Sequence, residues 1–451
     1  MGLMSITDLP FLLVESREHP THVGLLLVLR KPDGAGPDYV GGLYRAALTY
    51  DKIDPLFAKH PKQPVDLAGR IMWEENVEVD LDYHVRMSAL PHPGTQRQLV
   101  DLVSRMHGTL LDRHRPLWEC HFVDGLENAR FAIYFKIHHA LVDGVGGVQI
   151  GRRAFSERPD VQTAPPWAAV DSSFRQRVGG ARGRMRTLAA VARAGADVAR
   201  TFARAALDMA RPGGPVAPFT APRTILNQPI TGARRFAGRT FAIARLKAVA
   251  HAHGASLNDV VLALSAGGLR TYLAERDALP ERPLVAAVPV SIRKTDDGRG
   301  GNSISAMLCD LATQHADPVE RLRAITASTR AAKDSLAGAG TAGSVALAAA
   351  VLGVPALLGA VPGAGALIPP AYSLIISNVP GPKQIQYWNG AEVESWFPVS
   401  VPFEGQALNI TVVSYATDIS FGLIGCRTRM PGLERLLDGI EAGLLELETR
   451  M

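Results

Sequence analysis

Two β-rich runs joined by a short polar turn are the feature of this sequence that most constrains its fold. The first run is WECHFVDGL, and the second, FAIYFKIHH, ends in two adjacent histidines, His138 and His139. The segment Glu127-Asn128-Ala129 between the runs is typical of a hairpin turn. The sequence therefore predicts two antiparallel strands, with two imidazole side chains at the end of the second strand.

Strand alternation separates the two histidines. If the second strand continues to its end, His139 falls on the apolar face that includes Ile137, whereas His138 falls on the face of Lys136. The two rings should then point in opposite directions, which disfavours a metal ion held by both. His139 would face the interior, and a neutral imidazole with an ordinary pKa of roughly 6.5 is suited to act as a general base.

The glycine-rich segment after the histidines suits a binding loop. Asp143 lies four residues after His139, where a carboxylate can orient an imidazole, as in a catalytic triad, or pair with a distant arginine. Gly144, Gly146 and Gly147 permit tight turns and close approach of a substrate to the backbone. A lone histidine here would favour an ordinary core residue beside a turn. Two histidines with an Asp-Gly pair at this spacing favour a functional site.

The chain length predicts more than one domain. With 451 residues, 47% of them hydrophobic, the chain exceeds one ordinary core. We place an N-terminal half at 1–160, a crossover at 161–232 and a C-terminal half at 233–451. Prolines cluster at both ends of the crossover, and the Ala/Arg-rich segment between them favours a helix. We favour a solvated helix over a linker, and the alternative is a basic amphipathic helix that rests on anionic lipid.

Periodicity predicts elements in both halves. Residues His22–Arg30 favour a buried strand, and residues 95–112 favour a helix. Ser256 is expected to be the N-cap of a helix, with Asp259 three residues later in the manner of a capping box. Further strands are expected within residues 283–293, 372–379, 408–415 and 419–425, and an amphipathic helix at 431–450.

Composition limits the classes of binding partner and the cellular compartment that we expect for this protein. The formal net charge of +5 is modest for this length, so it argues against nucleic acid and fits an anionic ligand or surface better. The three cysteines, Cys120, Cys309 and Cys426, are far apart in the sequence and show no CxxC spacing, so they suggest neither a zinc site nor a disulfide framework, and this usage suits a reducing interior. The first residues carry acidic side chains and lack the basic segment followed by an apolar segment that marks a signal peptide, so we expect no signal peptide.

Residues 335–382 contain no charged side chain. Their length could span a bilayer on hydropathy alone. Glycines and prolines such as Gly353, Pro355 and Pro362 interrupt the stretch, however. We therefore prefer a pair of buried or interface-seeking helices to a transmembrane helix, and we expect any contact with lipid here.

Several motifs together resemble one enzyme family. HHALVDG matches the HHxxxDG motif of the CoA-dependent acyltransferase superfamily. Further segments resemble one branch, the bacterial wax ester synthase/diacylglycerol acyltransferases. These segments are PLWECHFVDGL, SLNDVVLALSAGGLRTYL, PVSIR followed by a Gly-Asn pair, SNVPGP, and the opening SITDLPFLLVESREHPTHVG. The resemblance runs from the first residues to the last predicted strands, and its order and spacing are hard to obtain by chance.

The resemblance implies an α/β fold of two chloramphenicol-acetyltransferase-like halves. Each half would have a mixed sheet flanked by helices, and an active-site channel would lie at their interface. Acyl-CoA would enter as a substrate, with no bound cofactor and no metal. Within the motif, His139 would be the catalytic base, beside His138 and Asp143. Asp143 is expected to pair with Arg293 and, with Gly144, to fix the loop rather than relay protons.

Other residues in the matching segments are candidates for substrate binding. They are Pro116, Leu117, Trp118, Asn258, Ser377 and Asn378. Packing of the hairpin is the favoured role of Trp118. A helix start explains Asn258 equally well, and a strand leading into a Pro-Gly turn explains Ser377 and Asn378 equally well.

The main functional hypothesis is therefore an O-acyltransferase. It would move a long-chain acyl group from acyl-CoA to diacylglycerol, to a long-chain alcohol, or to both, giving triacylglycerol or wax ester. We expect it in the cytoplasm, at the inner membrane face or on lipid inclusions. One alternative is another HHxxxDG acyltransferase with a small or carrier-bound acceptor, which the PLW and SNVPGP segments disfavour. A second is a catalytically silent lipid-binding protein, which the presence of His139 and Asp143 disfavours.

Overall fold

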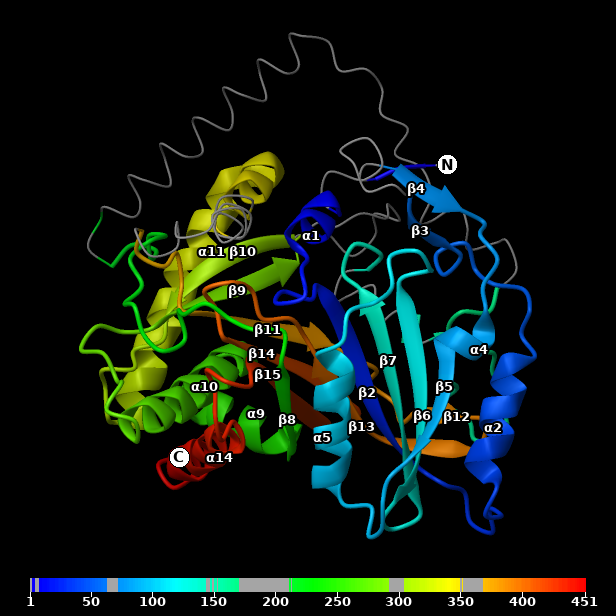
Figure 1. Cartoon of the computed structure of the whole chain (residues 1–451). Helices are drawn as coiled ribbons and strands as arrows, with labels where there is room; N and C mark the ends of the chain where they lie inside the picture. The colour runs from blue at the N-terminus through cyan, green and yellow to red at the C-terminus, as the bar shows by residue number, and fades with distance from the viewer. Residues whose placement is uncertain are drawn as a thin grey trace.

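Two six-stranded sheets stand side by side in the computed structural model, with helices packed against them (Figure 1). The structure describes residues 2–4, 8–62, 72–142, 147, 150–151, 153–169, 211, 213–291, 304–348, 351 and 368–451. Both sheets combine parallel and antiparallel neighbours, which confirms the predicted fold class of mixed sheets flanked by helices.

The first sheet carries the predicted hairpin. Its strand order is β12-β13-β2-β7-β6-β5. The strands span β2 (His22–Arg30), β5 (Val85–Ala89), β6 (Trp118–Leu126), β7 (Arg130–His138), β12 (Tyr387–Trp388) and β13 (Ala391–Val399). Between β6 and β7, Asn128 and Ala129 adopt φ values of 62° and 54°. Tight hairpin turns need such positive φ values, because their twist then matches that of the strands.

The second sheet has the order β10-β9-β11-β14-β15-β8. Its strands are β8 (Arg234–Ala242), β9 (Val285–Ser291), β10 (Ile304–Asp310), β11 (Leu374–Pro380), β14 (Leu408–Tyr415) and β15 (Asp418–Cys426). β9, β11 and β14 run parallel to one another, and the remaining neighbours are antiparallel. A small third sheet contains β1 (Gly2–Leu3), β4 (Met72–Glu75) and β3 (Lys59–Pro61).

The helices divide between the two large sheets. They are α1 (Leu9–Val14), α2 (Tyr39–Leu48), α4 (Leu81–His84), α5 (Gln96–His107), α9 (Ile243–Ala252), α10 (Leu257–Ala274), α11 (Pro318–Ala348) and α14 (Glu434–Glu448). α9, α10, α11 and α14 cover one face of the second sheet, where they bury its largest apolar core. α5 packs against both β2 and β8, and α1 lies between the two halves (Figure 1).

Two late strands, β12 and β13, join the first sheet. β13 pairs with β2, so that Trp396 lies opposite Leu27 and Pro398 lies opposite Leu25. The chain then returns to the second sheet through β14. The periodicity of the sequence did not predict that this late segment would join the first sheet, because the alternation pattern of a strand is the same whichever sheet the strand joins.

Capping explains where two predicted helices begin and end. Ser256 and Asp259 form the expected capping box at the start of α10. α5 ends at His107 rather than at residue 112. Lys136 of β7 donates hydrogen bonds to the carbonyl oxygens of Met106 and Thr109, at 3.2 and 3.1 Å, so a side chain from the sheet takes up carbonyl oxygens where the helix ends.

The uncharged segment lies partly outside the described residues. Its first part, to Ala348, continues α11, and its last part includes β11. Among the described residues, none of the helices combines the length and the apolar character needed to cross a membrane. The basic crossover segment at 170–210 is outside the described residues as well.

Candidate active site

The two motif histidines occupy different environments at the end of β7. His138 is the last residue of the strand and is fully buried, whereas His139 follows it and is partly exposed. The backbone N–H of His139 donates to the carbonyl oxygen of Thr21 at 3.1 Å. The residue just before strand β2 thus holds the turn that carries the second histidine.

Hydrogen bonds fix the ring of His138. Its Nδ1 accepts from the backbone N–H of Ala140 at 3.0 Å, so the proton of the neutral ring is on Nε2. Nε2 lies 2.9 Å from the hydroxyl of Thr21 and 3.3 Å from the carboxylate of Glu15. A ring with both nitrogens engaged in this way is suited to support the turn, not to exchange protons with a substrate.

His139 differs from His138 in being partly exposed. Its ring stacks on Phe11 of α1, with ring centroids 4.0 Å apart and planes inclined by 9°. Phe11 in turn lies 6.5 Å from Phe403, which follows β13 on the way to the second sheet. The imidazole is therefore placed where the two halves meet.

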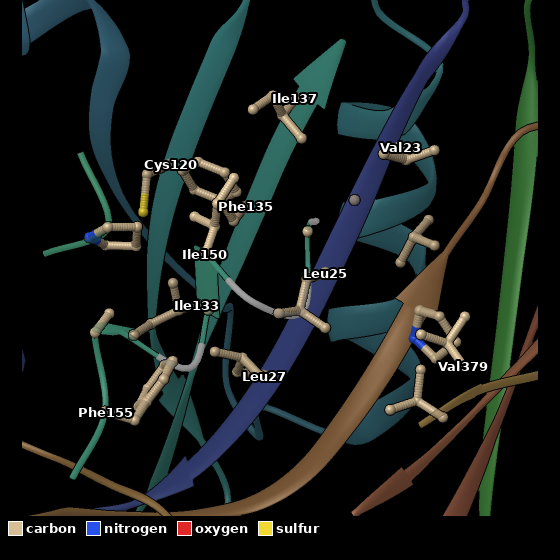
Figure 2. A pocket seen from close by; sticks show the side chains of 18 of the residues that line it. Val23, Leu25, Leu27, Cys120, Ile133, Phe135, Ile137, Ile150, Phe155 and Val379 are labelled. Carbon is tan, nitrogen blue, oxygen red and sulfur yellow. The ribbon is translucent and has the colours of Figure 1, made fainter. Parts of the chain in front are cut away.

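A cavity of about 120 Å³ lies against the face of the first sheet that carries Ile133 and Ile137 of β7. Val23, Leu25 and Leu27 of β2 line it together with Ile133 and Ile137 of β7, and Figure 2 shows these side chains converging along the two strands. Ile137 is two residues before His139. The cavity thus runs along the strand that ends in the motif histidines, and its walls are almost wholly apolar.

The second sheet contributes the opposite wall of this cavity. Val379 of β11 and Thr411 and Val413 of β14 line it. Ser377 pairs with Thr411 and lies two residues before Val379, so strand alternation puts Ser377 on the cavity side of the sheet. Asn378 falls on the opposite side, with its neighbour Val412 in the helix-covered core.

The remaining sequence candidates are not among the residues that line this cavity. Trp118 is fully buried, donates from Nε1 to the carbonyl oxygen of Phe57 at 2.9 Å and stacks on Trp167. Leu117 packs in a cluster with Leu12 and Ala140, which places it behind the histidine turn. Pro116 lies in a polar surface hollow beside His84, and Asn258 lies at the start of α10.

Three predicted site residues, Asp143, Gly144 and Arg293, fall outside the described residues. The expected pairing of Asp143 with Arg293 stays a prediction.

A buried ionic network occupies the other face of β7. Lys136 is fully buried and its Nζ lies 3.0 Å from the carboxylate of Glu119, which also bonds to His121. Burial lowers the pKa of Lys136, although Glu119 opposes the shift. The pKa of Glu119 is about 2, because hydrogen bonds and charges from His121, Lys136 and Arg86 outweigh the effect of burial. This network fastens β6 and β7 to the end of α5.

Sequence reasoning missed the residues that surround the histidine turn. Phe11, Glu15 and Thr21 all contact the turn, yet they precede it by more than 100 residues. The resemblance included this opening segment without giving any of its residues a role. An acidic residue just after a short apolar helix carries no signal of a partner that lies in a distant strand.

Comparisons with known proteins agree with this arrangement. Residues 4–261 match the family model of the wax ester synthase/diacylglycerol acyltransferase catalytic domain, and residues 300–448 match the model of its C-terminal domain. A putative diacylglycerol O-acyltransferase of Mycobacterium tuberculosis is 45% identical over 448 residues, covering 99% of both chains. A probable diacylglycerol O-acyltransferase of the same organism is 41% identical over 465 residues, again covering 99% of both.

Solved structures give the same result at the level of the fold. The wax ester synthase/diacylglycerol acyltransferase from Marinobacter aquaeolei VT8 superposes with a TM-score of 0.77 at 36% identity, covering 100% of this chain and 99% of that one. The first condensation domain of the calcium-dependent antibiotic synthetase has a TM-score of 0.63 at 19% identity over 99% of this chain, which shows a shared fold. The chain belongs to the wax ester synthase/diacylglycerol acyltransferase family of acyltransferases.

Proposed function

We propose that this enzyme transfers a long-chain acyl group from acyl-CoA to the hydroxyl of diacylglycerol, of a long-chain alcohol, or of both, with His139 as the general base. The observation that carries the proposal is the partly exposed imidazole of His139, two residues beyond an apolar cavity that both sheets line. The names of the relatives, which are diacylglycerol O-acyltransferases and a wax ester synthase, support this choice of substrates.

The proposed reaction is a direct transfer within a ternary complex. His139 removes the proton of the acceptor hydroxyl, and the oxygen attacks the thioester carbonyl to form a tetrahedral intermediate. The C–S bond then breaks, and coenzyme A leaves as a thiolate. The imidazolium of His139 returns the proton to this thiolate, so the reaction ends with an ester, a thiol and a neutral base.

The oxyanion of the intermediate needs hydrogen-bond donors, which are worth about 3 kcal/mol each in other enzymes. Ser377 is the preferred candidate among the predicted substrate-binding residues, because strand alternation turns it towards the cavity, unlike Asn378. Asn258 stays a candidate at the start of α10. Asp143 and Arg293 are proposed to fix the loop.

The cavity is proposed to hold a hydrocarbon chain of one lipid substrate. Its lining offers apolar contacts along β2 and β7 and few polar groups. Each buried methylene of a chain contributes about 0.8 kcal/mol, so a long chain gains much of its binding energy there. Either the acyl group or the acceptor has the chemistry to fill it.

Release of free thiol from acyl-CoA tests the function. Purified enzyme is incubated with palmitoyl-CoA and, in separate reactions, with diacylglycerol, a long-chain alcohol, or a small alcohol. We expect thiol release with a lipid acceptor and ester product in extracts. Release only with the small alcohol would favour the alternative acceptor class, and no release with any acceptor would favour a silent lipid-binding protein.

Two matched substitutions identify the chain in the cavity. Val23 is close to the histidine end of the strand pair, and Leu27 is four residues farther along β2. Val23→Phe should impair substrates of every chain length, whereas Leu27→Phe should impair long chains and spare short ones. Chain length is varied in the acyl-CoA at fixed acceptor and then in the alcohol at fixed acyl-CoA. The series that responds to Leu27→Phe identifies the occupant, and no response in either series would contradict the assignment.

We further propose peripheral association with a membrane surface or lipid inclusion in the cytoplasm, because both substrates are lipids and residues 335–382 carry no charge. Flotation with anionic liposomes tests this association. Enzyme that remains in the bottom fraction at low salt would contradict it.

A further inference from the structure

We propose that Glu15 is a positioning residue for the acyl transfer, which acts on His139 through Thr21 and His138. The inference rests on the proposed function, in which His139 is the base, and it gives the opening segment a role in the reaction. Glu15 follows α1 directly, and its side chain is 2% exposed. A buried carboxylate so close to a motif histidine requires a structural or a functional reason.

Glu15 holds the residue that supports the histidine turn. One carboxylate oxygen accepts from the backbone N–H of Thr21 at 3.3 Å and lies 3.3 Å from Nε2 of His138. The carbonyl oxygen of the same Thr21 accepts the backbone N–H of His139. The carboxylate of Glu15 therefore holds the backbone N–H of Thr21, and the backbone carbonyl of Thr21 holds the backbone of His139.

Thr21 also connects the turn to the ring that covers His139. Its hydroxyl donates to the carbonyl oxygen of Phe11 at 2.9 Å and accepts from Nε2 of His138. The aromatic ring of Phe11 stacks on the imidazole of His139. The backbone of the base and the ring against its face thus depend on the same two residues: Glu15 binds the backbone of Thr21, and Thr21 contacts both.

Arg113 keeps Glu15 ionised in this buried place. Its Nε donates to the second carboxylate oxygen at 2.8 Å, and its guanidinium also bonds to the carbonyl oxygen of Leu12. Burial by itself raises the pKa of Glu15, but hydrogen bonds and charges from His138 and Arg113 lower it to about 2. The carboxylate of Glu15 is therefore negatively charged at neutral pH and lies beside His138.

The test compares Glu15→Gln with Glu18→Gln in the full-length enzyme. Glu18 is an exposed residue of the same segment whose carboxylate bonds only to Ser16 among the described residues. We expect Glu15→Gln to lower kcat by on the order of 10- to 100-fold with an unchanged KM for acyl-CoA, because a displaced base loses its alignment. Glu18→Gln should match the wild type.

The pH profile separates positioning from simple loss of fold. Removing the negative charge disfavours the protonated imidazole, so the acidic limb of the kcat/KM profile should move to lower pH in Glu15→Gln. If folding of that variant fails, Thr21→Val removes the hydroxyl at constant shape and should lower kcat with an unchanged KM.

Each outcome decides the proposal. A wild-type kcat and profile in Glu15→Gln or, if that variant fails to fold, in Thr21→Val would overturn it. So would a loss of activity that merely follows a lower melting temperature, with the acidic limb unmoved. A wild-type enzyme without activity on any acceptor would instead contradict the proposed function itself.

Discussion

The two faces of β7 differ in chemistry. On one face, Lys136 and His138 are fully buried and bound to carboxylates and carbonyl oxygens. On the other face, Ile133 and Ile137 border an apolar cavity. The polar face specifies the geometry of the strand, because each of its groups has a fixed partner, and the apolar face leaves room for a ligand. A single strand can therefore have fixed polar contacts on one face and line a cavity with the other.

The strongest test of this comparison is His139→Ala. We expect kcat to fall by about 10²- to 10⁴-fold, because the variant lacks the proposed general base. The melting temperature should change little, since the side chain is partly exposed. Thiol release from palmitoyl-CoA measures the effect. Undiminished activity would remove His139 from the mechanism.

A substitution on the polar face should change stability. Lys136→Met leaves Glu119 buried with fewer partners, which should cost about 3 kcal/mol in the free energy of unfolding. The matched control is Arg239→Met, at surface ion pairs with Asp438 and Glu441, which should cost less than about 1 kcal/mol. Urea unfolding compares the two variants. Equal effects would show that the buried network adds nothing beyond a surface pair.

Two buried histidines beside the polar face predict a pH dependence of stability. Burial lowers the pKa of His107 to about 3 and that of His22 well below its usual value. The unfolded chain binds these protons below about pH 6.5 and the folded chain does not, so stability is full above that pH and declines as pH falls towards 3. At pH 5, His107 alone should cost about 2 kcal/mol.

Urea unfolding at pH 7.5 and pH 5 measures this decline. His107→Gln should flatten it. The carboxylates of Glu15 and Glu119, with pKa values of about 2, lose their contribution only below about pH 4.5 and leave this window unaffected. Equal stability at the two pH values would contradict the neutral, buried state of these rings.

The smallest effect is expected on the apolar face. Ile133→Val removes one methylene from a wall that already borders a cavity, and it should cost about 0.5–1 kcal/mol. Urea unfolding against the Lys136→Met variant completes the comparison. A cost as large as that of Lys136→Met would mean that the two faces hold the fold equally.

The sequence by itself determined the local elements and the family. His22–Arg30 is a strand with the predicted bounds, Ser256 and Asp259 form the predicted capping box, and the motifs identified the family. Local signals suffice there, because alternation, capping and turn preferences act over a few residues. Alternation likewise separated His138 from His139, whose environments do differ.

Only the tertiary structure decided what surrounds these elements. β13 joins the first sheet although it follows most of the second, and Lys136 takes up carbonyl oxygens where α5 ends, earlier than periodicity indicated. Glu15 reaches His138 across more than 100 residues. Such contacts depend on how distant segments pack, and no local pattern records them. The distant residues that contact the two motif histidines were therefore invisible in the sequence that revealed the motif itself.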